Sequence, residues 1–142
     1  DMFEAMFPHR MQRLIAPALE YGKPVALYTR GRTDKLLPLL EQMGFTVLLP
    51  VEPDCNDLVT LKAQAHGRLA LVGGIPVSLL TYGNWEKIEE TVHDRCLQLA
   101  AGGGYVLGAS GPIVEGIPPQ NYWAMVQAAH KYGSYAALGD AV

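Results

Sequence analysis

The hydrophobic and polar positions of this chain alternate between a helical period and short β-forming runs. Four helix-like stretches, with apolar residues every three or four positions, each end at a glycine, and a run of four or five β-forming residues follows each one. The helix-ending glycines are Gly22, Gly44, Gly67 and Gly102, and the runs are 25–29, 46–50, 69–72 and 105–108. A fifth helix-like stretch ends at Gly133. Helices and strands that alternate through short links predict an α/β fold with a parallel sheet.

Proline and cap positions add expectations about single helices. Pro8 suits a first helical position, and Pro17, inside the apolar pattern of 9–21, predicts a kink or a division of that helix. Asn56 or Asp57 can cap the helix that follows the second strand, because both side chains carry an acceptor for the first free N–H groups.

Two further expectations concern burial and helix starts. The apolar stripe of the fourth helix includes Trp85, and that of the last helix includes Tyr122 and Val126, so these side chains are expected to face the core. Ile75 and Pro76 follow the third strand without a helix-start signal, so no helix is expected directly after it.

Composition and charge narrow the class of protein. The 142 residues carry a net charge of −3 without a basic run, so nucleic acid is not expected as a partner. No apolar stretch reaches the ~20 residues that a membrane span needs, and no signal peptide opens the chain. Cys55 and Cys96 lie in unlike settings, which fits a reducing compartment, and we expect a cytoplasmic protein without a membrane partner.

Length and topology together suggest half of a larger fold. Residues 1–142 are expected to form a single domain, and a start at Asp1 rather than at methionine suggests a piece of a longer chain. Four αβ units are half of a (β/α)8 barrel, which typically needs ~250 residues. The inner face of that barrel is expected to be lined by residues of the first three strands. These residues are Ala26, Tyr28, Leu48 and Leu71, or the residues next to them.

Candidate site residues lie where the predicted strands end, because parallel sheets bind ligands at their carboxyl ends. Tyr28, Arg30 and Arg32 end the first strand, and two arginines there can clamp carboxylates or can be solvated loop residues. Glu52 and Asp54 follow the second strand, as acid–base groups or as ion-pair partners of the arginines. Pairing is the favoured interpretation.

The other two strand ends carry weaker candidates. Gly73 and Gly74 follow the third strand and can let the backbone approach a ligand closely. Ser110 follows the fourth strand with no base beside it in the sequence, so it is not assigned as a nucleophile. The glycine triplet 102–104 follows a helix and opens a strand, which indicates a helix stop rather than a phosphate loop. No two histidines have the i, i+4 spacing and no Cys-x-x-Cys occurs, so no metal site is predicted.

Several short motifs occur in a fixed order along the chain. Three of them are Gly-Gly-Gly-Tyr-Val-Leu at 102–107, Gly-Ile-Pro-Pro-Gln-Asn at 116–121 and Ala-Met-Val-Gln-Ala-Ala-His-Lys-Tyr-Gly at 124–133. Tyr-Thr-Arg-Gly at 28–31 and Val-Glu-Pro at 51–53 fit the same order. Through these motifs nearly the whole chain resembles the C-terminal part of the uroporphyrinogen decarboxylase superfamily. The resemblance implies an α/β fold of four consecutive αβ units with parallel strands, the C-terminal half of a (β/α)8 TIM barrel.

The resemblance also implies two chemistries. One branch of the superfamily decarboxylates acetate side chains of uroporphyrinogen without a cofactor, and another contains zinc-dependent, corrinoid-linked methyltransferases. The zinc ligands of the second branch, a His-x-Cys pair and a later Cys, match Tyr28, Arg30 and Gly111 or a neighbour of Gly111, so zinc is expected to be absent. The strand end Phe-Thr-Lys-Gly of the decarboxylases is similar to 28–31, whereas their His near Gly111 is missing here. Their groups that handle the pyrrole lie in the first half of the barrel, outside this sequence.

The function expected from the resemblance is decarboxylation of a porphyrinogen carboxylate, without a cofactor, by a carboxy-lyase. The alternatives are a corrinoid-dependent methyltransferase-like protein that lacks the usual zinc ligands, or a non-catalytic module that binds a tetrapyrrole or a partner protein. A free-standing flavodoxin-like domain with helices on both faces of its sheet is a third alternative. The expected partners are a tetrapyrrole or corrinoid, and either a missing N-terminal half or a second copy of the chain. No catalytic residue is assigned, and the expected substrate-binding residues are Tyr28, Arg30, Arg32, Glu52, Gly74 and Ser110.

Overall fold

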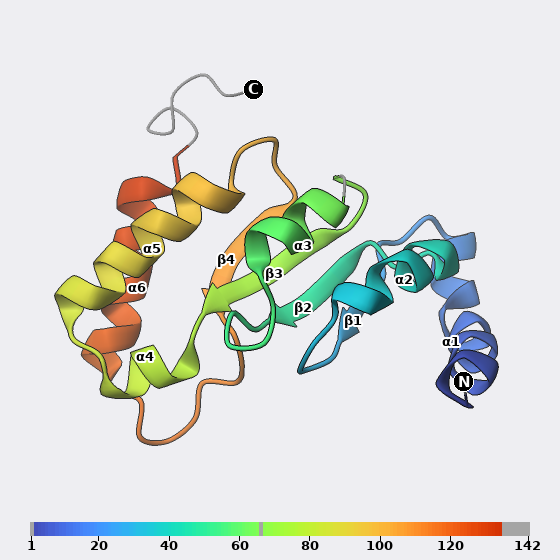
Figure 1. Cartoon of the computed structure of the whole chain (residues 1–142), viewed down its shortest axis with the longest axis horizontal. Coiled ribbons are helices and arrows are strands. Elements are labelled where there is room, and N and C mark those ends of the chain that lie inside the picture. The colour runs from blue at the N-terminus through green and yellow to red at the C-terminus, as the bar shows by residue number, and fades with distance from the viewer. Residues whose placement is uncertain (1, 66, 135–142) are drawn as a thin grey trace.

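The protein is described by a computed structural model that covers residues 2–65 and 67–134. Four parallel strands form a sheet in the order β1-β2-β3-β4 (Figure 1). The strands are β1 (Ala26–Tyr28), β2 (Val47–Val51), β3 (Ala70–Ile75) and β4 (Tyr105–Ala109). Each strand overlaps one of the predicted runs and pairs in parallel with the next, so the predicted sheet is confirmed.

Helical segments precede, connect and follow the strands. In chain order they are α1 (Met2–Glu20), the 3₁₀ turn η1 (Asp34–Leu36), α2 (Leu37–Met43), α3 (Leu58–Ala65), α4 (Val77–Tyr82), α5 (Trp85–Leu99) and α6 (Pro119–Tyr132). Because the strand order follows the chain without reversal, right-handed crossovers place the connecting helices on one face of the sheet. This arrangement is that of half a (β/α)8 barrel. The alternative of an open sheet with helices on both faces is therefore wrong, because its strand order reverses at a switch point.

Two clusters of buried side chains lie between the sheet and the helices. The first lies beneath α1, α2 and α3, with Leu48 and Leu71 fully buried at its centre. The second packs α4, α5 and α6 together over the end of β3, around Ile75, Ile88 and Val92. Figure 1 shows α1 beyond the β1 side of the sheet and α5 and α6 beyond the β4 side, with α2 and α3 between them.

The face of the sheet that points away from the helices is open. Ala26 and Tyr28 are exposed on this face, as predicted for the inner barrel wall, and Val106 of β4 is exposed as well. Leu48 and Leu71 do not lie there, because both are buried against the helices. Side chains of a strand alternate between faces, so the neighbours of these two leucines, rather than the leucines themselves, face the open side.

The predicted helix ends are confirmed by backbone conformation. Gly22, Gly44, Gly67 and Gly102 all have φ between 62° and 96°, a region that glycine enters without the steric cost of a Cβ. The predicted start at Pro8 and the predicted division at Pro17 are wrong, because α1 runs unbroken through both prolines. Ile15, Phe7 and Met11 pack α1 against the first cluster, and packing of this kind supplies most of the stability of a helix in a folded protein.

Two other expectations about helices are wrong. α4 begins at Val77, directly after Pro76, where the missing proline N–H costs little because the first N–H groups of a helix have no intrahelical acceptor. Trp85 is exposed because it is the first residue of α5, and Tyr122 is exposed because the buried stripe of α6 is shifted by one residue. The shift follows from Asn121, whose amide binds backbone carbonyls of the α4 segment. Within the described parts of the chain, no helix combines the length and apolarity needed to cross a bilayer.

Candidate functional site

Parallel pairing brings the ends of all four strands to one edge of the sheet, which we call the carboxyl edge. Ligands of parallel α/β folds bind at this edge, because the loops there are free to vary while the strands hold them in place. The six predicted site residues lie in the last residues of the strands or in the loops that follow them. Their side chains, however, do not form a single group.

Arg30 and Glu52 form the centre of the carboxyl edge. Glu52 Oε1 accepts hydrogen bonds from Arg30 Nε at 2.8 Å and from Arg30 Nη2 at 2.6 Å. Glu52 Oε2 accepts a further hydrogen bond from the backbone N–H of Gly31. The predicted pairing of these two charges is confirmed, and the carboxylate of Glu52 is used on both of its oxygens.

The charge of this pair is fixed by its surroundings. Burial acts to raise the pKa of Glu52, but the Gly31 N–H and the Arg30 guanidinium together outweigh burial and lower that pKa below its usual range. The hydrogen bonds and charge of Glu52 raise the pKa of Arg30 further above its ordinary value. Both groups are therefore ionised at neutral pH, and Glu52 acts as an ion-pair partner rather than as an acid or base.

Arg30 also reaches across the carboxyl edge toward the loop after β4. A Cβ atom placed on Gly111 would lie 4.0 Å from Arg30 Nη2 and 3.2 Å from Val77 Cγ2. The guanidinium from the first strand thus sits beside the position where, by the resemblance, related proteins carry a histidine or a cysteine. A Cβ at Gly111 would be in ordinary van der Waals contact with the guanidinium and would crowd only Val77.

Gly74 and Ser110 are brought together between β3 and β4. The Ser110 hydroxyl oxygen accepts a hydrogen bond from the Gly74 N–H at 3.2 Å, and the Ser110 N–H donates to the Ile75 carbonyl at 2.8 Å. Tyr105 donates its hydroxyl hydrogen to the Gly73 carbonyl at 2.8 Å. Ser110 is buried, and these bonds give it and Gly74 a structural role in closing the end of the sheet.

Among the described residues, Tyr28, Arg32 and Asp54 make no hydrogen bond or ion pair with Arg30 or Glu52. Tyr28 points to the open face of the sheet and is exposed there. Arg32 pairs with Asp34 two residues later, with both hydrogen bonds at 2.9 Å, and not with a residue of the second strand end. Asp54 is exposed. Arg32 therefore is a surface loop residue, the alternative kept open for it above.

Asn56 is a site residue that the sequence did not identify. The helix cap expected from Asn56 or Asp57 is made by Asp57, which accepts from the N–H groups of Val59 and Thr60. The Asn56 amide instead bonds to the loop after β1, through Gly31 and Thr33. The available signal for Asn56 was its closeness in sequence to the charged residues that follow β2. Its hydrogen-bond partners could not be identified, because they depend on how the two loops fold.

The residues of the carboxyl edge do not favour chemistry by a thiolate or by a metal ion. Cys55 is exposed, but burial of its sulfur and the charge of Glu52 raise the pKa of the thiol, which disfavours the reactive thiolate. Among the described residues, no group of three or more His, Cys, Asp or Glu side chains could hold a metal ion. The zinc positions implied by the resemblance hold Tyr28, Arg30 and Gly111, and a fixed guanidinium beside Gly111 repels a cation, so these residues do not fit zinc.

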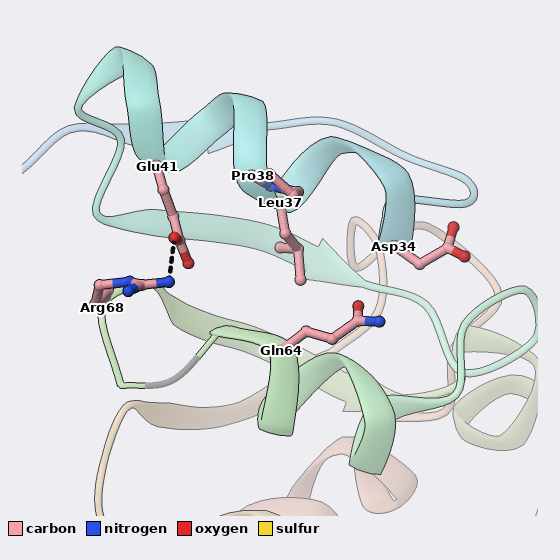
Figure 2. Close-up of a pocket in the computed structure, with 6 residues that line it drawn as sticks. All are labelled: Asp34, Leu37, Pro38, Glu41, Gln64 and Arg68. Atoms are coloured by element: carbon pink, nitrogen blue, oxygen red, sulfur yellow. Dashed lines mark ion pairs between the residues drawn. The ribbon is translucent and has the colours of Figure 1, made fainter.

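A second arginine–glutamate pair lies at the edge of the sheet opposite the carboxyl edge, where the strands begin. It lines a pocket of about 280 Å³ between α2 and α3. Figure 2 shows Leu37 pointing from α2 toward Gln64 of α3, and Glu41 pointing toward Arg68, which enters from the side. Arg68 Nη2 lies 2.7 Å from Glu41 Oε2. The other carboxylate oxygen, Glu41 Oε1, is buried and has no hydrogen-bond partner among the described residues.

Comparison with known proteins adds a family and a fold. Residues 1–132 match the model of a family described as "Uroporphyrinogen decarboxylase (URO-D)". Among solved structures, the chain is similar to one titled "methyltransferase from Methanosarcina mazei", with a TM-score of 0.75 and 22% sequence identity. The match covers 93% of this chain and 37% of that one, so this chain spans well under half of its length. None of the curated proteins compared matches the chain.

Proposed function

Because this chain belongs to the uroporphyrinogen decarboxylase family, we propose that it forms one part of a barrel site for an acidic tetrapyrrole and contributes to removing a carboxylate from a porphyrinogen. The observation that supports this proposal is the Arg30 guanidinium, held by Glu52 at the carboxyl edge and placed beside Gly111. A guanidinium in a fixed orientation binds carboxylates through charge and paired hydrogen bonds. The porphyrinogen side chains are carboxylates, which match this group.

The ion pair leaves Arg30 able to bind a ligand. Glu52 takes up Nε and one N–H of Nη2, and Nη1 has no partner among the described residues. The Arg30 side chain is also well exposed, so a substrate carboxylate can reach it from solvent. Glu52 then has the role of fixing the guanidinium, which reduces the side-chain entropy that the ligand must overcome on binding.

The remaining wall of the site has to come from other strands. The outer edges of β1 and β4 have no partner strand among the described residues, and the inner face of the sheet is open. A groove of about 400 Å³ follows β4 beneath α6, lined partly by Leu107, Met125 and Ala129. We propose that strands of an N-terminal half, or of a second copy of the chain, pair with these edges and complete the site.

The chemistry proposed for the complete site is electrostatic. When the C–C bond to CO2 breaks, its electron pair passes to the methylene carbon and the pyrrole ring, and a proton from water or from an acid of the complete site takes the place of CO2. A preorganised charged group stabilises the charge that develops in the transition state. Arg30 holds a substrate carboxylate in place, and the group that stabilises the ring is assigned to the other half of the barrel. No cofactor is proposed. Corrinoid-linked methyl transfer is the second candidate, because the structure similar to this chain is titled a methyltransferase.

Ligand titration separates these candidates. Uroporphyrin, which carries acetate and propionate side chains, and methylcobalamin, whose ring side chains are mostly amides, are added separately and followed by absorbance. Arg30→Ala is expected to weaken uroporphyrin binding by about 1.5–3 kcal/mol, the range for a lost charged hydrogen bond. Arg68→Ala, which removes an equally exposed arginine at the other end of the sheet, is the matched control and should leave the affinity unchanged.

Three results contradict the proposal. The first is uroporphyrin binding that does not change in Arg30→Ala, which removes Arg30 from the site. The second is tight binding of methylcobalamin without binding of uroporphyrin, which favours the corrinoid function. The third is binding of neither ligand by the chain in the presence of its N-terminal half, which favours a module that binds a partner protein.

A further inference from the structure

The buried amide of Asn56 connects the loops that follow β1 and β2. Its Nδ2 group donates to the carbonyl of Gly31 at 2.9 Å and to the carbonyl of Glu52 at 3.0 Å. Its Oδ1 atom accepts from the Thr33 N–H at 2.8 Å and from the Thr33 hydroxyl at 3.2 Å. An asparagine amide offers two donors and one acceptor oxygen with two lone pairs, so all of its capacity is used here.

We infer that Asn56 is a positioning residue of the proposed anion site, which fixes the Arg30 guanidinium by holding the Gly31 peptide and the Glu52 backbone in place. Gly31 donates its N–H to Glu52, and Asn56 binds the carbonyl of that same residue. Asn56 also binds the carbonyl of Glu52 itself. One side chain therefore sets the distance between the loop that carries Arg30 and the loop that carries Glu52. The inference rests on the proposed role of Arg30 as a ligand contact.

The hydrogen bonds of Asn56 are buried, which explains how one amide can determine the position of the exposed Arg30 side chain. Asn56 is 8% exposed and Thr33 is 1% exposed, so water does not replace these hydrogen bonds when they are lost. Gly31 has a φ of 91°, a left-handed conformation that its own hydrogen bonds to Glu52 and Asn56 hold in place. Loss of the amide frees the Gly31 peptide, and Glu52 then loses the N–H that aligns its carboxylate with Arg30.

The chain offers a matched residue whose role is only structural. Asn121 is 7% exposed, and its Nδ2 group donates to two carbonyls, those of Leu80 and Gly83, both at 2.9 Å. These bonds tie α6 to the end of α4 in the second cluster of buried residues. Asn121→Ala removes two hydrogen bonds donated to backbone carbonyls, as Asn56→Ala does in addition to the 3.4 Å contact from Nδ2 to Cys55 Sγ, but it touches neither the loop of Arg30 nor the loop of Glu52.

The first test needs no ligand. Hydrogen exchange of the Arg30 Nε–H and the Gly31 N–H is measured by NMR in the full chain and in Asn56→Ala, Asn56→Asp and Asn121→Ala. Both Asn56 variants are expected to exchange at least ~10-fold faster at these two positions, as the loss of about one hydrogen bond implies. Asn121→Ala should keep the rates of the unaltered chain. Protection of the Leu71 amide in β3 shows in each case that the sheet is folded.

The second test uses uroporphyrin. Asn56→Ala is expected to weaken its binding ~10-fold, and to weaken it no further in the Arg30→Ala background, because a double-mutant cycle isolates an effect that passes through Arg30. If the unaltered chain does not bind uroporphyrin even in the presence of its N-terminal half, the proposed function fails, and the exchange rates still decide the role of Asn56.

Two outcomes overturn the inference. One is an Asn56 variant that is folded and keeps the original exchange rates at Arg30 and Gly31. The other is loss of the fold in both Asn56 variants while Asn121→Ala stays folded, because Asn56 is then a residue of overall stability. Asn56→Asp keeps the acceptor for Thr33 and loses only the hydrogen bonds that Nδ2 donates, so it is the milder change.

Discussion

The two ends of the sheet each carry an arginine–glutamate pair, and the two pairs are alike in composition and exposure. Arg30 and Glu52 are 61% and 12% exposed at the carboxyl edge, and Arg68 and Glu41 are 65% and 17% exposed at the opposite edge. Both carboxylates contact the guanidinium, at 2.6 and 2.7 Å respectively. By these criteria either pair could be chosen as a candidate site.

The pairs differ in what surrounds the carboxylate. Both oxygens of Glu52 accept hydrogen bonds, one from Arg30 and one from Gly31, and Asn56 holds the backbone on both sides. Glu41 Oε1 is buried without a partner among the described residues (Figure 2). An ion pair fixes a charge for ligand binding only when the other lone pairs and the backbone around it are also held. The predictions below test that difference.

The largest difference between the two edges is expected at their glycines. A Cβ on Gly74, which has a φ of 94°, would lie 2.5 Å from the Tyr105 hydroxyl, whereas a Cβ on Gly102, with a φ of 73°, meets nothing within 4 Å. We expect Gly74→Ala to lower the free energy of unfolding by about 3 kcal/mol or more, and Gly102→Ala by about 1 kcal/mol, the cost of the left-handed backbone alone. Urea unfolding measures both, and equal losses would show that the crowding beside Tyr105 has no effect.

The carboxylates themselves should differ next. Glu52→Gln replaces an acceptor by an amide that cannot receive all three N–H groups, and we expect it to lower the free energy of unfolding by about 1–2 kcal/mol. Glu41→Gln loses the charge of an ion pair whose arginine is exposed, but it also makes neutral a partly buried side chain whose second terminal atom has no partner among the described residues, so a change below about 0.5 kcal/mol is expected. If denaturant unfolding gives the same loss for both variants, the surrounding hydrogen bonds do not distinguish the pairs.

Acidification should reduce the difference in the free energy of unfolding between the unaltered protein and Glu52→Gln. The pKa of Glu52 is lower in the folded protein than its ordinary value, so its contribution is fully present above about pH 4.3, the ordinary glutamate value. The unfolded chain binds the proton first, and the contribution disappears as the pH falls through the lowered pKa. Thermal unfolding of both proteins from pH 7 to pH 3 should therefore converge. A constant difference over this range contradicts the lowered pKa.

The smallest effect concerns metal at the carboxyl edge. With Tyr28, Arg30 and Gly111 at the positions that the resemblance assigns to zinc ligands, added zinc should leave the melting temperature unchanged, and so should a chelator. Elemental analysis of the purified protein provides the second measurement. About one tightly held zinc ion per chain would contradict the account of Arg30 as the group that fills this position.

The sequence predicted those features that depend on local signals. Glycine stops and β-forming runs sufficed for the parallel sheet, and the pairing of Arg30 with Glu52 followed because parallel strands end at the same edge. The role of Asn56 could not be predicted, because its amide binds Thr33, 23 residues away, and the sequence equally allowed a helix cap. α4 was missed because it is short and starts after Pro76 with no side-chain cap.

The reach of Arg30 links the site to the bending of the whole sheet. Arg30 follows the first strand and Gly111 follows the last, and strands in a flat sheet of this width lie roughly 14 Å apart from first to fourth. The guanidinium nevertheless lies 4.0 Å from the Cβ position of Gly111, so the gap is closed by the length of the side chain together with the curvature of the strands. We expect a flatter sheet to move the guanidinium away from Gly111. Strands that complete the proposed barrel would then change the proposed anion site through the curvature of the sheet, even where they touch none of its residues.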